Sequence, residues 1–200
     1  MIKIVVLVSG RGSNLRAICG AIDAGTCRAD IVGVIADRKK AAALEYAERR
    51  GIPVRVVALR MGDDRDAWNR KIAAEVATLQ PDLVVLAGFM RVLAPAFIDR
   101  FAGRIINVHP AILPAFPGHN ATEQAIAAGV RLSGCTVHVV DAGVDTGPII
   151  AQSAVTVLPE DTPDSLHARI QVQEHILLPQ VIDQISSGEI SLHPLTFRSS

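Results

Sequence analysis

The sequence predicts an α/β fold built on a doubly wound, mainly parallel β-sheet, and three observations support this prediction. The chain has 200 residues, of which 50% are hydrophobic, which is enough for one domain with a sizeable core. Short apolar runs alternate along the chain with longer stretches of helical character. In the first half these runs are apolar on both faces, as in strands that helices cover from both sides.

The first half is expected to contain buried strands that alternate with helices. Strands are predicted at residues 3–8, 31–35, 54–57, 83–86 and 105–108. Helices are predicted between them, at residues 14–24, 40–50 and 66–79. Because strands separated by helices form βαβ units, we expect these strands to be parallel.

The pattern changes after Pro110, because proline and glycine interrupt residues 114–118. A short helix is predicted from Thr122 onward. Residues 134–140 and 149–157 then have the character of strands, which we expect to be antiparallel. The second half therefore adds antiparallel strands to the sheet.

A long helix is predicted near the end of the chain. Thr162 and Pro163 are typical of an N-cap and a first helical position, and the helix should run toward Gln184. Residues 198–200 are expected to be frayed. We find no linker or repeat, so residues 1–200 are predicted to form a single domain.

The composition argues against several classes of function. The chain has 20 Lys and Arg residues and 20 Asp and Glu residues, so its net charge gives no general attraction to nucleic acid. No apolar run approaches the roughly 18 residues needed to span a membrane, and the apolar start is too short for a signal peptide. We therefore expect a cytoplasmic protein that binds neither nucleic acid nor a membrane.

The cysteines and histidines do not indicate a disulfide framework or a metal site. The cysteines are three in number and lack CxxC spacing, so we expect buried or idle thiols. His167, His175 and His193 lack the spacing of metal ligands. We therefore predict no metal.

A glycine-rich segment, residues 9–14, lies between the first predicted strand and the first predicted helix. Its glycines allow a sharp turn, and free amides at the start of a helix can face an anion. The segment is not a P-loop and matches a dinucleotide motif poorly, so a single phosphate fits better than a pyrophosphate. An alternative is a tight turn capped by Ser13 or Asn14, which needs no ligand.

Two polar residues emerge together from the fifth predicted strand. The strand period of two places Asn107 and His109 on one face, with Ile106 and Val108 on the other. Pro110 should end the strand at the carboxyl edge, where open α/β sheets bind ligands. The glycine-rich segment is expected at the same edge.

Asp145 lies in a turn-rich segment, residues 141–148, and is a plausible partner for His109. A carboxylate beside an imidazole raises the imidazole pKa and orients the ring, which suits proton transfer near neutral pH. The amide of Asn107 could donate a hydrogen bond to a developing oxyanion. The residues alone fit equally well with a structural role for both Asn107 and His109.

Four segments decide between these interpretations, because together they resemble a known family. The segments are Ser9-Gly-Arg-Gly-Ser-Asn-Leu15, Leu86-Ala-Gly-Phe-Met-Arg-Val-Leu93, Asn107-Val-His-Pro-Ala-Ile-Leu-Pro114 and Gly134-Cys-Thr-Val-His138. They resemble the phosphoribosylglycinamide formyltransferases of the folate-dependent formyltransferase superfamily, over nearly the whole chain. The resemblance implies a Rossmann-like formyltransferase fold.

The resemblance also implies a reaction. The primary amine of glycinamide ribonucleotide attacks the formyl carbon of 10-formyltetrahydrofolate, the co-substrate, in purine biosynthesis, without a metal or a covalent enzyme intermediate. By resemblance, Asn107 and His109 stabilise the tetrahedral oxyanion, and Asp145 orients and charges His109. Which group moves which proton is left open.

The resemblance further assigns binding residues. Those for glycinamide ribonucleotide are Gly12, Ser13 and Asn14 at the phosphate, Glu174 at the ribose hydroxyls, and Gln171 one helical turn earlier. Those for the folate are Arg65, Met90, Arg91, Val92, Leu93, Asn107, Asp141, Ala142, Gly143, Val144 and Asp145. Without the resemblance, residues 90–93 would be interpreted as ordinary core.

Some positions have no clear role. Many relatives carry a histidine two to four residues after the glycine that is Gly118 here. The roles of His119 and Asn120 therefore stay open. His138 shares a strand face with Thr136 and either approaches the site or is a satisfied strand histidine.

Three alternative functions have sequence requirements of their own. A methionyl-tRNA formyltransferase needs an RNA-binding domain, and a formyltetrahydrofolate deformylase uses water as the acceptor and usually has an extra N-terminal domain; we expect neither extension. A non-catalytic nucleotide-binding α/β module would use the site residues only to shape a pocket.

We expect a monomer or homodimer whose phosphate-binding half is about 1–100 and whose folate-binding and catalytic half is about 101–200.

Overall fold

The computed structural model describes residues 1–192 and 195–197, and its centre is a seven-stranded sheet in the order β3-β2-β1-β4-β5-β6-β7. The strands β1 to β5 are parallel to one another, whereas β6 pairs antiparallel with both β5 and β7. The predicted doubly wound, mainly parallel sheet with antiparallel strands in the second half is confirmed. The strands are β1 (Ile2–Val8), β2 (Ala29–Ala36), β3 (Val54–Val56), β4 (Leu83–Leu86), β5 (Ile105–His109), β6 (Leu132–Val139) and β7 (Ile149–Thr156).

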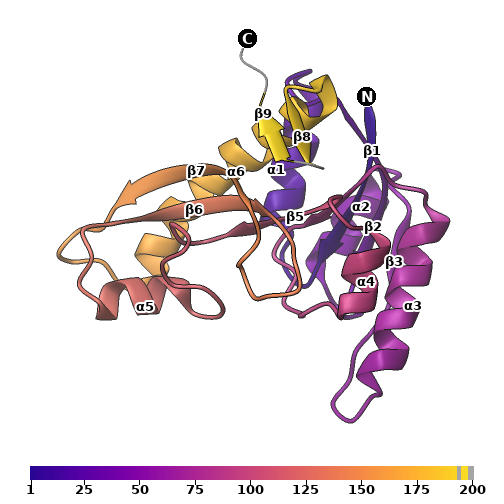
Figure 1. Cartoon of the computed structure of the whole chain (residues 1–200), viewed down its shortest axis with the longest axis horizontal. Coiled ribbons are helices and arrows are strands. Elements are labelled where there is room, and N and C mark those ends of the chain that lie inside the picture. The colour runs from indigo at the N-terminus through magenta and orange to yellow at the C-terminus, as the bar shows by residue number, and fades with distance from the viewer. Residues whose placement is uncertain (193–194, 198–200) are drawn as a thin grey trace.

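Helices cover both faces of the parallel part of the sheet (Figure 1). One apolar cluster joins α1, α2 and α6 to the sheet, and a second joins α3 and α4 to the opposite face. Successive residues of β1 alternate between the two clusters, and every residue from Ile4 to Val8 is fully buried. This explains why the strand is apolar on both faces. The helices are α1 (Ser13–Asp23), α2 (Ala42–Arg49), α3 (Arg65–Thr78), α4 (Pro95–Arg100), α5 (Ala121–Ala127) and α6 (Pro163–Ser187).

The sequence did not predict α4 or the small second sheet, which pairs β8 (Ile190–Leu192) with β9 (Leu195–Phe197). The helix α4 has six residues and each of these strands has three, too few for a hydrophobic period to appear. The other predicted elements exist, with ends displaced by a few residues. The expectations about His193 and residues 198–200 lie outside the described residues.

The antiparallel strand β6 is covered differently on its two sides. One side packs on α6, and the other contacts the segment that follows β5. The hydroxyl of Thr136 accepts a hydrogen bond from the Leu113 amide (3.0 Å) and donates one to the Ala111 carbonyl (2.7 Å). The strand β6 therefore holds the chain immediately after His109.

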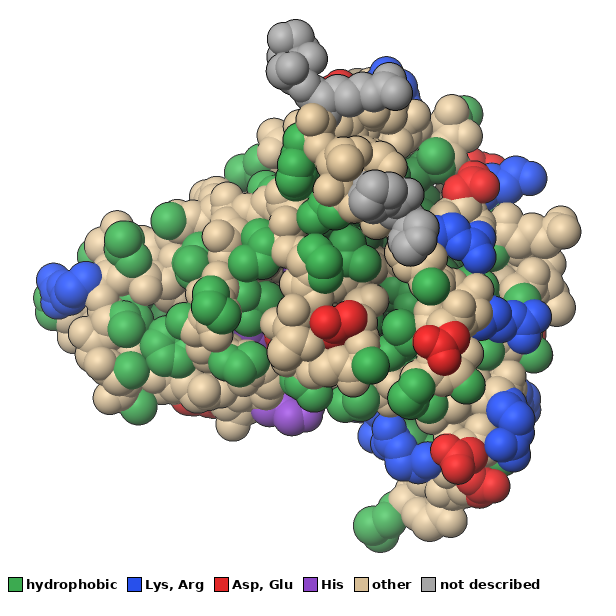
Figure 2. Space-filling model, viewed as in Figure 1, with side chains coloured by type: hydrophobic (Ala, Val, Ile, Leu, Met, Phe, Trp, Pro, Cys, Tyr) green, Lys and Arg blue, Asp and Glu red, His purple; other side chains and the backbone are tan. Residues whose placement is uncertain are grey.

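Charged side chains of both signs are interspersed on the visible surface. In Figure 2 they gather on the half of the molecule that holds α3, whereas the visible side of the β6–β7 half shows mostly hydrophobic and uncharged side chains. No helix within the described residues is long and apolar enough to cross a membrane. Cys19, Cys27 and Cys135 are buried and unpaired.

The helix α6 begins with the predicted N-cap and first-turn proline. The Thr162 hydroxyl accepts a hydrogen bond from the Ser165 amide (3.2 Å), and the Ser165 hydroxyl accepts one from the Thr162 amide (3.0 Å). This capping box satisfies amides that the helix itself cannot pair.

Thr162→Ala should lower the free energy of unfolding by about 1 kcal/mol, because the capping hydroxyl is lost. Thr162→Ser keeps a hydroxyl at the same place and is the matched control. Urea denaturation of the three proteins measures the difference. A Thr162→Ala variant as stable as the Ser variant would contradict this account of the helix start.

Candidate active site

A cavity of about 410 Å³ opens at the carboxyl edge of the parallel strands. It is lined by residues 88–93 after β4, by residues 107–110 at the end of β5, and by residues 118–123. Asp141, residues 143–145 and the start of α6 complete its wall. The sheet edge at which the sequence predicts ligand binding therefore contains a cavity.

The strand β5 delivers two polar side chains to this cavity. Asn107 and His109 both line it and contact Asp145, whereas the side chains of Ile106 and Val108 belong to an apolar cluster, as the predicted alternation requires; Val108 also borders the cavity. The strand ends at His109, before Pro110, also as predicted.

The pairing of β5 with β6 extends this polar face. Asn107 lies opposite His138, and His109 lies opposite Thr136. Directly opposed residues of an antiparallel pair have neighbouring side chains. His138, which is 2% exposed, therefore approaches the site from the adjacent strand.

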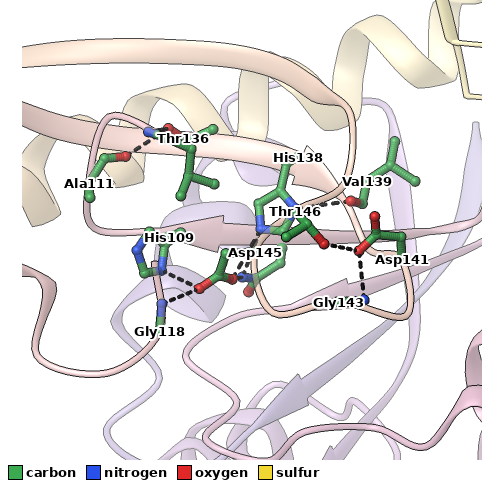
Figure 3. A network of polar contacts seen from close by, with 12 residues as sticks. His109, Ala111, Gly118, Thr136, His138, Val139, Asp141, Gly143, Asp145 and Thr146 are labelled. Atoms are coloured by element: carbon green, nitrogen blue, oxygen red, sulfur yellow. Dashed lines mark hydrogen bonds and ion pairs between the residues drawn. The ribbon is translucent and has the colours of Figure 1, made fainter. Parts of the chain in front are cut away.

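The carboxylate of Asp145 joins these residues (Figure 3). Its Oδ2 lies 3.2 Å from His109 Nδ1 and accepts a hydrogen bond from the Gly118 amide at 2.8 Å. Its Oδ1 lies 3.3 Å from Asn107 Nδ2 and 3.4 Å from His138 Nε2. The structure thus brings together the three residues that were predicted to be catalytic and adds His138.

The surroundings of Asp145 favour its ionised form. Burial by itself raises the pKa of the carboxyl, but the hydrogen bonds from His138 and Gly118 and the nearby His109 outweigh it and hold the pKa below the usual value. The carboxylate is therefore an acceptor at neutral pH.

The far side of the His109 ring determines where its hydrogens lie. Nε2 is 2.8 Å from the Phe116 carbonyl oxygen, which can only accept, so Nε2 carries a hydrogen. On the near side Nδ1 faces the Asp145 carboxylate, which also only accepts. Both contacts are hydrogen bonds when His109 is an imidazolium, so the site is complementary to a charged His109.

The loop that carries Asp145 is held by its own hydrogen bonds. Asp141 Oδ1 accepts from the Gly143 amide (3.0 Å) and from the Thr146 hydroxyl (2.7 Å). Asp145 has a left-handed backbone with a φ of 55°, a conformation that aspartate tolerates better than most residues. Ala142 is exposed and is not among the residues that line the cavity.

Residues 90–93 form a wall of the cavity rather than ordinary core. Met90 and Val92 are 57% and 58% exposed, and only Leu93, at 6%, is buried as a core residue would be. The Met90 amide donates to the Ser9 hydroxyl (2.8 Å), which ties this wall to the glycine-rich segment.

Arginine side chains anchor this wall from two directions. Arg91 Nε donates to the fully buried carboxylate of Asp37 at 2.6 Å. Arg65 Nη2 donates to the Val92 carbonyl at 2.9 Å. Arg65 thus lies against the wall, although it does not line the cavity itself.

The glycine-rich segment leaves the start of α1 without a side-chain cap. Gly12 is the N-cap residue with a φ of 75°, and a β-carbon there would lie 2.6 Å from that of Ala43. The alternative of a cap from Ser13 or Asn14 is wrong, because neither makes a capping bond. The first amides of α1 are therefore available to an anion.

Asn14 instead connects α1 to the last long helix. Its Nδ2 donates to Glu174 Oε2 at 3.0 Å, and both side chains are buried. Burial raises the pKa of Glu174. Gln171 lies one turn earlier on α6 and is half-buried.

Comparison with known proteins identifies the family. The family model described as formyl transferase matches residues 2–182. The chain belongs to the formyl transferase family. A solved structure shows the same architecture as this chain. It is that of glycinamide ribonucleotide transformylase 1 from Symbiobacterium toebii, with a TM-score of 0.94 and 40% identity, and the match covers 100% of this chain and 95% of that one.

Two formyl transferase relatives resemble this chain over most of their lengths. The phosphoribosylglycinamide formyltransferase of Mycobacterium tuberculosis (strain H37Rv) is 47% identical over 190 residues, 95% of this chain and 87% of the relative. The enzyme of the same name from Escherichia coli (strain K12) is 40% identical over 191 residues, 96% of this chain and 90% of the relative.

Several groups at this formyl transferase site were not predicted from the sequence. The Phe116 carbonyl and the Gly118 amide are backbone groups, and no residue type could have indicated them. Asp37 and Ser9 both follow predicted strands, so their position at the carboxyl edge was the available signal. Among residues 1–192 and 195–197, no three His, Cys, Asp or Glu side chains are placed to hold a metal ion.

The lowered pKa of Asp145 predicts how stability depends on pH. The unfolded chain binds a proton at this carboxyl more readily than the folded chain does, so the ionised Asp145 stabilises the fold above the ordinary aspartate range. This stability is lost as the pH falls through the folded pKa. Denaturation at several pH values should show the advantage of the wild type over Asp145→Asn shrinking with acidification. An advantage that stays constant with pH would contradict the assignment.

Proposed function

We propose that this chain transfers the formyl group of 10-formyltetrahydrofolate to the primary amine of glycinamide ribonucleotide, a step of purine biosynthesis. The observation that carries the proposal is that Asn107, His109 and Asp145 meet through hydrogen-bond distances at the wall of one cavity. The names and nearly full-length similarity of the relatives support this choice of donor and acceptor.

The residues of the trio have distinct tasks in this reaction. The amine attacks the formyl carbon, a C–N bond forms, and the formyl oxygen becomes an oxyanion. An Asn107 N–H donates a hydrogen bond to this oxyanion, the positive charge of protonated His109 stabilises it, and Asp145 keeps His109 oriented and charged. The bond from carbon to N10 of the folate then breaks, while the attacking amine loses a proton and N10 gains one.

The start of α1 and the middle of α6 would bind the nucleotide. The amides at Gly12, Ser13 and Asn14 are available to a single phosphate. Glu174, tied to Asn14, would accept hydrogen bonds from the ribose hydroxyls, with Gln171 nearby. These groups align the amine with the formyl carbon, so that proximity supplies much of the rate enhancement.

The folate would occupy the cavity between residues 90–93 and the loop 141–145. Exposed Met90 and Val92 offer an apolar wall for a flat pteridine ring. Arg65, beside Val92, would meet the carboxylates of the folate's glutamate. The phosphate-binding half, about 1–100, and the folate-binding and catalytic half, about 101–200, together form a single domain that acts in the cytoplasm as a monomer or homodimer.

Incubating the chain with 10-formyltetrahydrofolate and glycinamide ribonucleotide tests the proposal. We expect tetrahydrofolate and the N-formyl nucleotide to appear in equal amounts. Formate instead of the N-formyl nucleotide would identify a deformylase. No turnover at all would support a non-catalytic binding module.

Asp145→Asn should lower kcat by about 10²- to 10⁴-fold, because the charge that supports protonated His109 is lost. The variant should still fold, with the lower stability expected from the pKa of Asp145, and the KM for both substrates should change little. Asp183→Asn, which breaks a pair with Arg28 remote from the cavity, is the control. Near-normal turnover of Asp145→Asn would refute the assigned role.

Gly12→Ala should raise the KM for glycinamide ribonucleotide at least about 10-fold, since the β-carbon would clash with Ala43 in a strained backbone conformation. The KM for the folate should stay the same. Gly20→Ala, on the same helix with no atom within 4 Å of its β-carbon, is the control. Equal changes in both KM values would place the phosphate elsewhere.

A further inference from the structure

His138 lines the cavity, and the proposed reaction gives it no task. It is 2% exposed and lies opposite Asn107 across the β5–β6 pair. Its ring makes polar contacts at both nitrogens. Nδ1 is 2.9 Å from the Val139 carbonyl, and Nε2 is 3.2 Å from Asn107 Nδ2 and 3.4 Å from Asp145 Oδ1 (Figure 3).

The positions of the hydrogens follow from the partners. The Val139 carbonyl can only accept, so Nδ1 of His138 carries a hydrogen. Nε2 can then accept from the Asn107 amide in the neutral ring, or donate to Asp145 Oδ1 in the charged ring. In either state Nε2 lies between the proposed oxyanion donor and the carboxylate that supports His109.

The same contacts orient the amide of Asn107. The end of the amide that faces the Asp145 carboxylate must be NH₂, since two acceptor oxygens would repel each other. The Asp145 oxygen and a neutral His138 Nε2 lie close together on one side of that NH₂ group, so they share one of its hydrogens and leave the second for the oxyanion. Rotation of Asn107 about its last torsion would break both contacts.

We propose that His138 is a positioning residue for formyl transfer: through Nε2 it holds the Asn107 amide and the Asp145 carboxylate in the orientations that the oxyanion and His109 require. The inference rests on the proposed function. The proposal assigns different roles to the two nitrogens of the His138 ring. Nε2 contacts the site residues, whereas the Nδ1 contact to Val139 stays within β6.

Two variants exploit this separation. The amide nitrogen of a glutamine can occupy the place of Nε2, whereas that of an asparagine reaches only the place of Nδ1. His138→Gln therefore keeps a polar group at the place of Nε2, where its amide nitrogen can donate to Asp145 or its amide oxygen can accept from Asn107, and His138→Asn retains only the contact with Val139. Both keep a polar group of similar size on the buried face, so neither requires an empty cavity.

Steady-state kinetics of the full chain should distinguish the variants. His138→Asn should lose about 10- to 100-fold in kcat, the range typical of groups that orient a functional residue, with the KM for both substrates nearly unchanged. His138→Gln should recover most of this loss. A reversed pattern, equal losses, or normal turnover in both variants would overturn the proposal.

A readout without substrates keeps this test independent of the proposed function. In ¹⁵N spectra of histidine-labelled protein, the His109 ring signals should shift in His138→Asn and return toward wild type in His138→Gln. Unchanged His109 signals in His138→Asn would overturn the proposal. Absence of formyl transfer by the wild type would instead refute the proposed function, and the spectra would still decide whether His138 positions the site.

Discussion

The carboxylate of Asp145 is the group on which the rest of the site depends. Four polar groups from three segments converge on its two oxygens: His109 and Asn107 from β5, the Gly118 amide, and His138 from β6. Burying a carboxylate costs free energy unless its lone pairs have partners, and here each oxygen has two polar neighbours. The same contacts that make burial tolerable give each neighbouring side chain its orientation.

The fold assembles this group from elements that have other reasons to be where they are. The parallel strands place the start of α1, residues 88–93 and the end of β5 at one edge of the sheet. The hydrogen bond from Met90 to Ser9 joins the proposed folate wall to the proposed phosphate segment. Thr136 of β6 holds the chain that follows His109. Both proposed substrate sites are therefore supported by one rigid scaffold.

The parts of the site that could be predicted from the sequence are those that local patterns determine. The period of two placed Asn107 beside His109, and Pro110 located the end of the strand. The role of His138 stayed open because it depends on the register between β5 and β6, which pairs it with Asn107. The suggested cap by Asn14 failed because that side chain bonds to Glu174, 160 residues later in the chain. Long-range partners of this kind leave no trace in local spacing.

The central claim is that His109 and Asp145 act in formyl transfer as one unit, and a double-mutant cycle on kcat tests it most directly. Residues that work as a unit show strongly non-additive losses. The account predicts that the double variant His109→Asn, Asp145→Asn is about as slow as the slower single variant. Losses that multiply would show two independent contributions and would contradict the account.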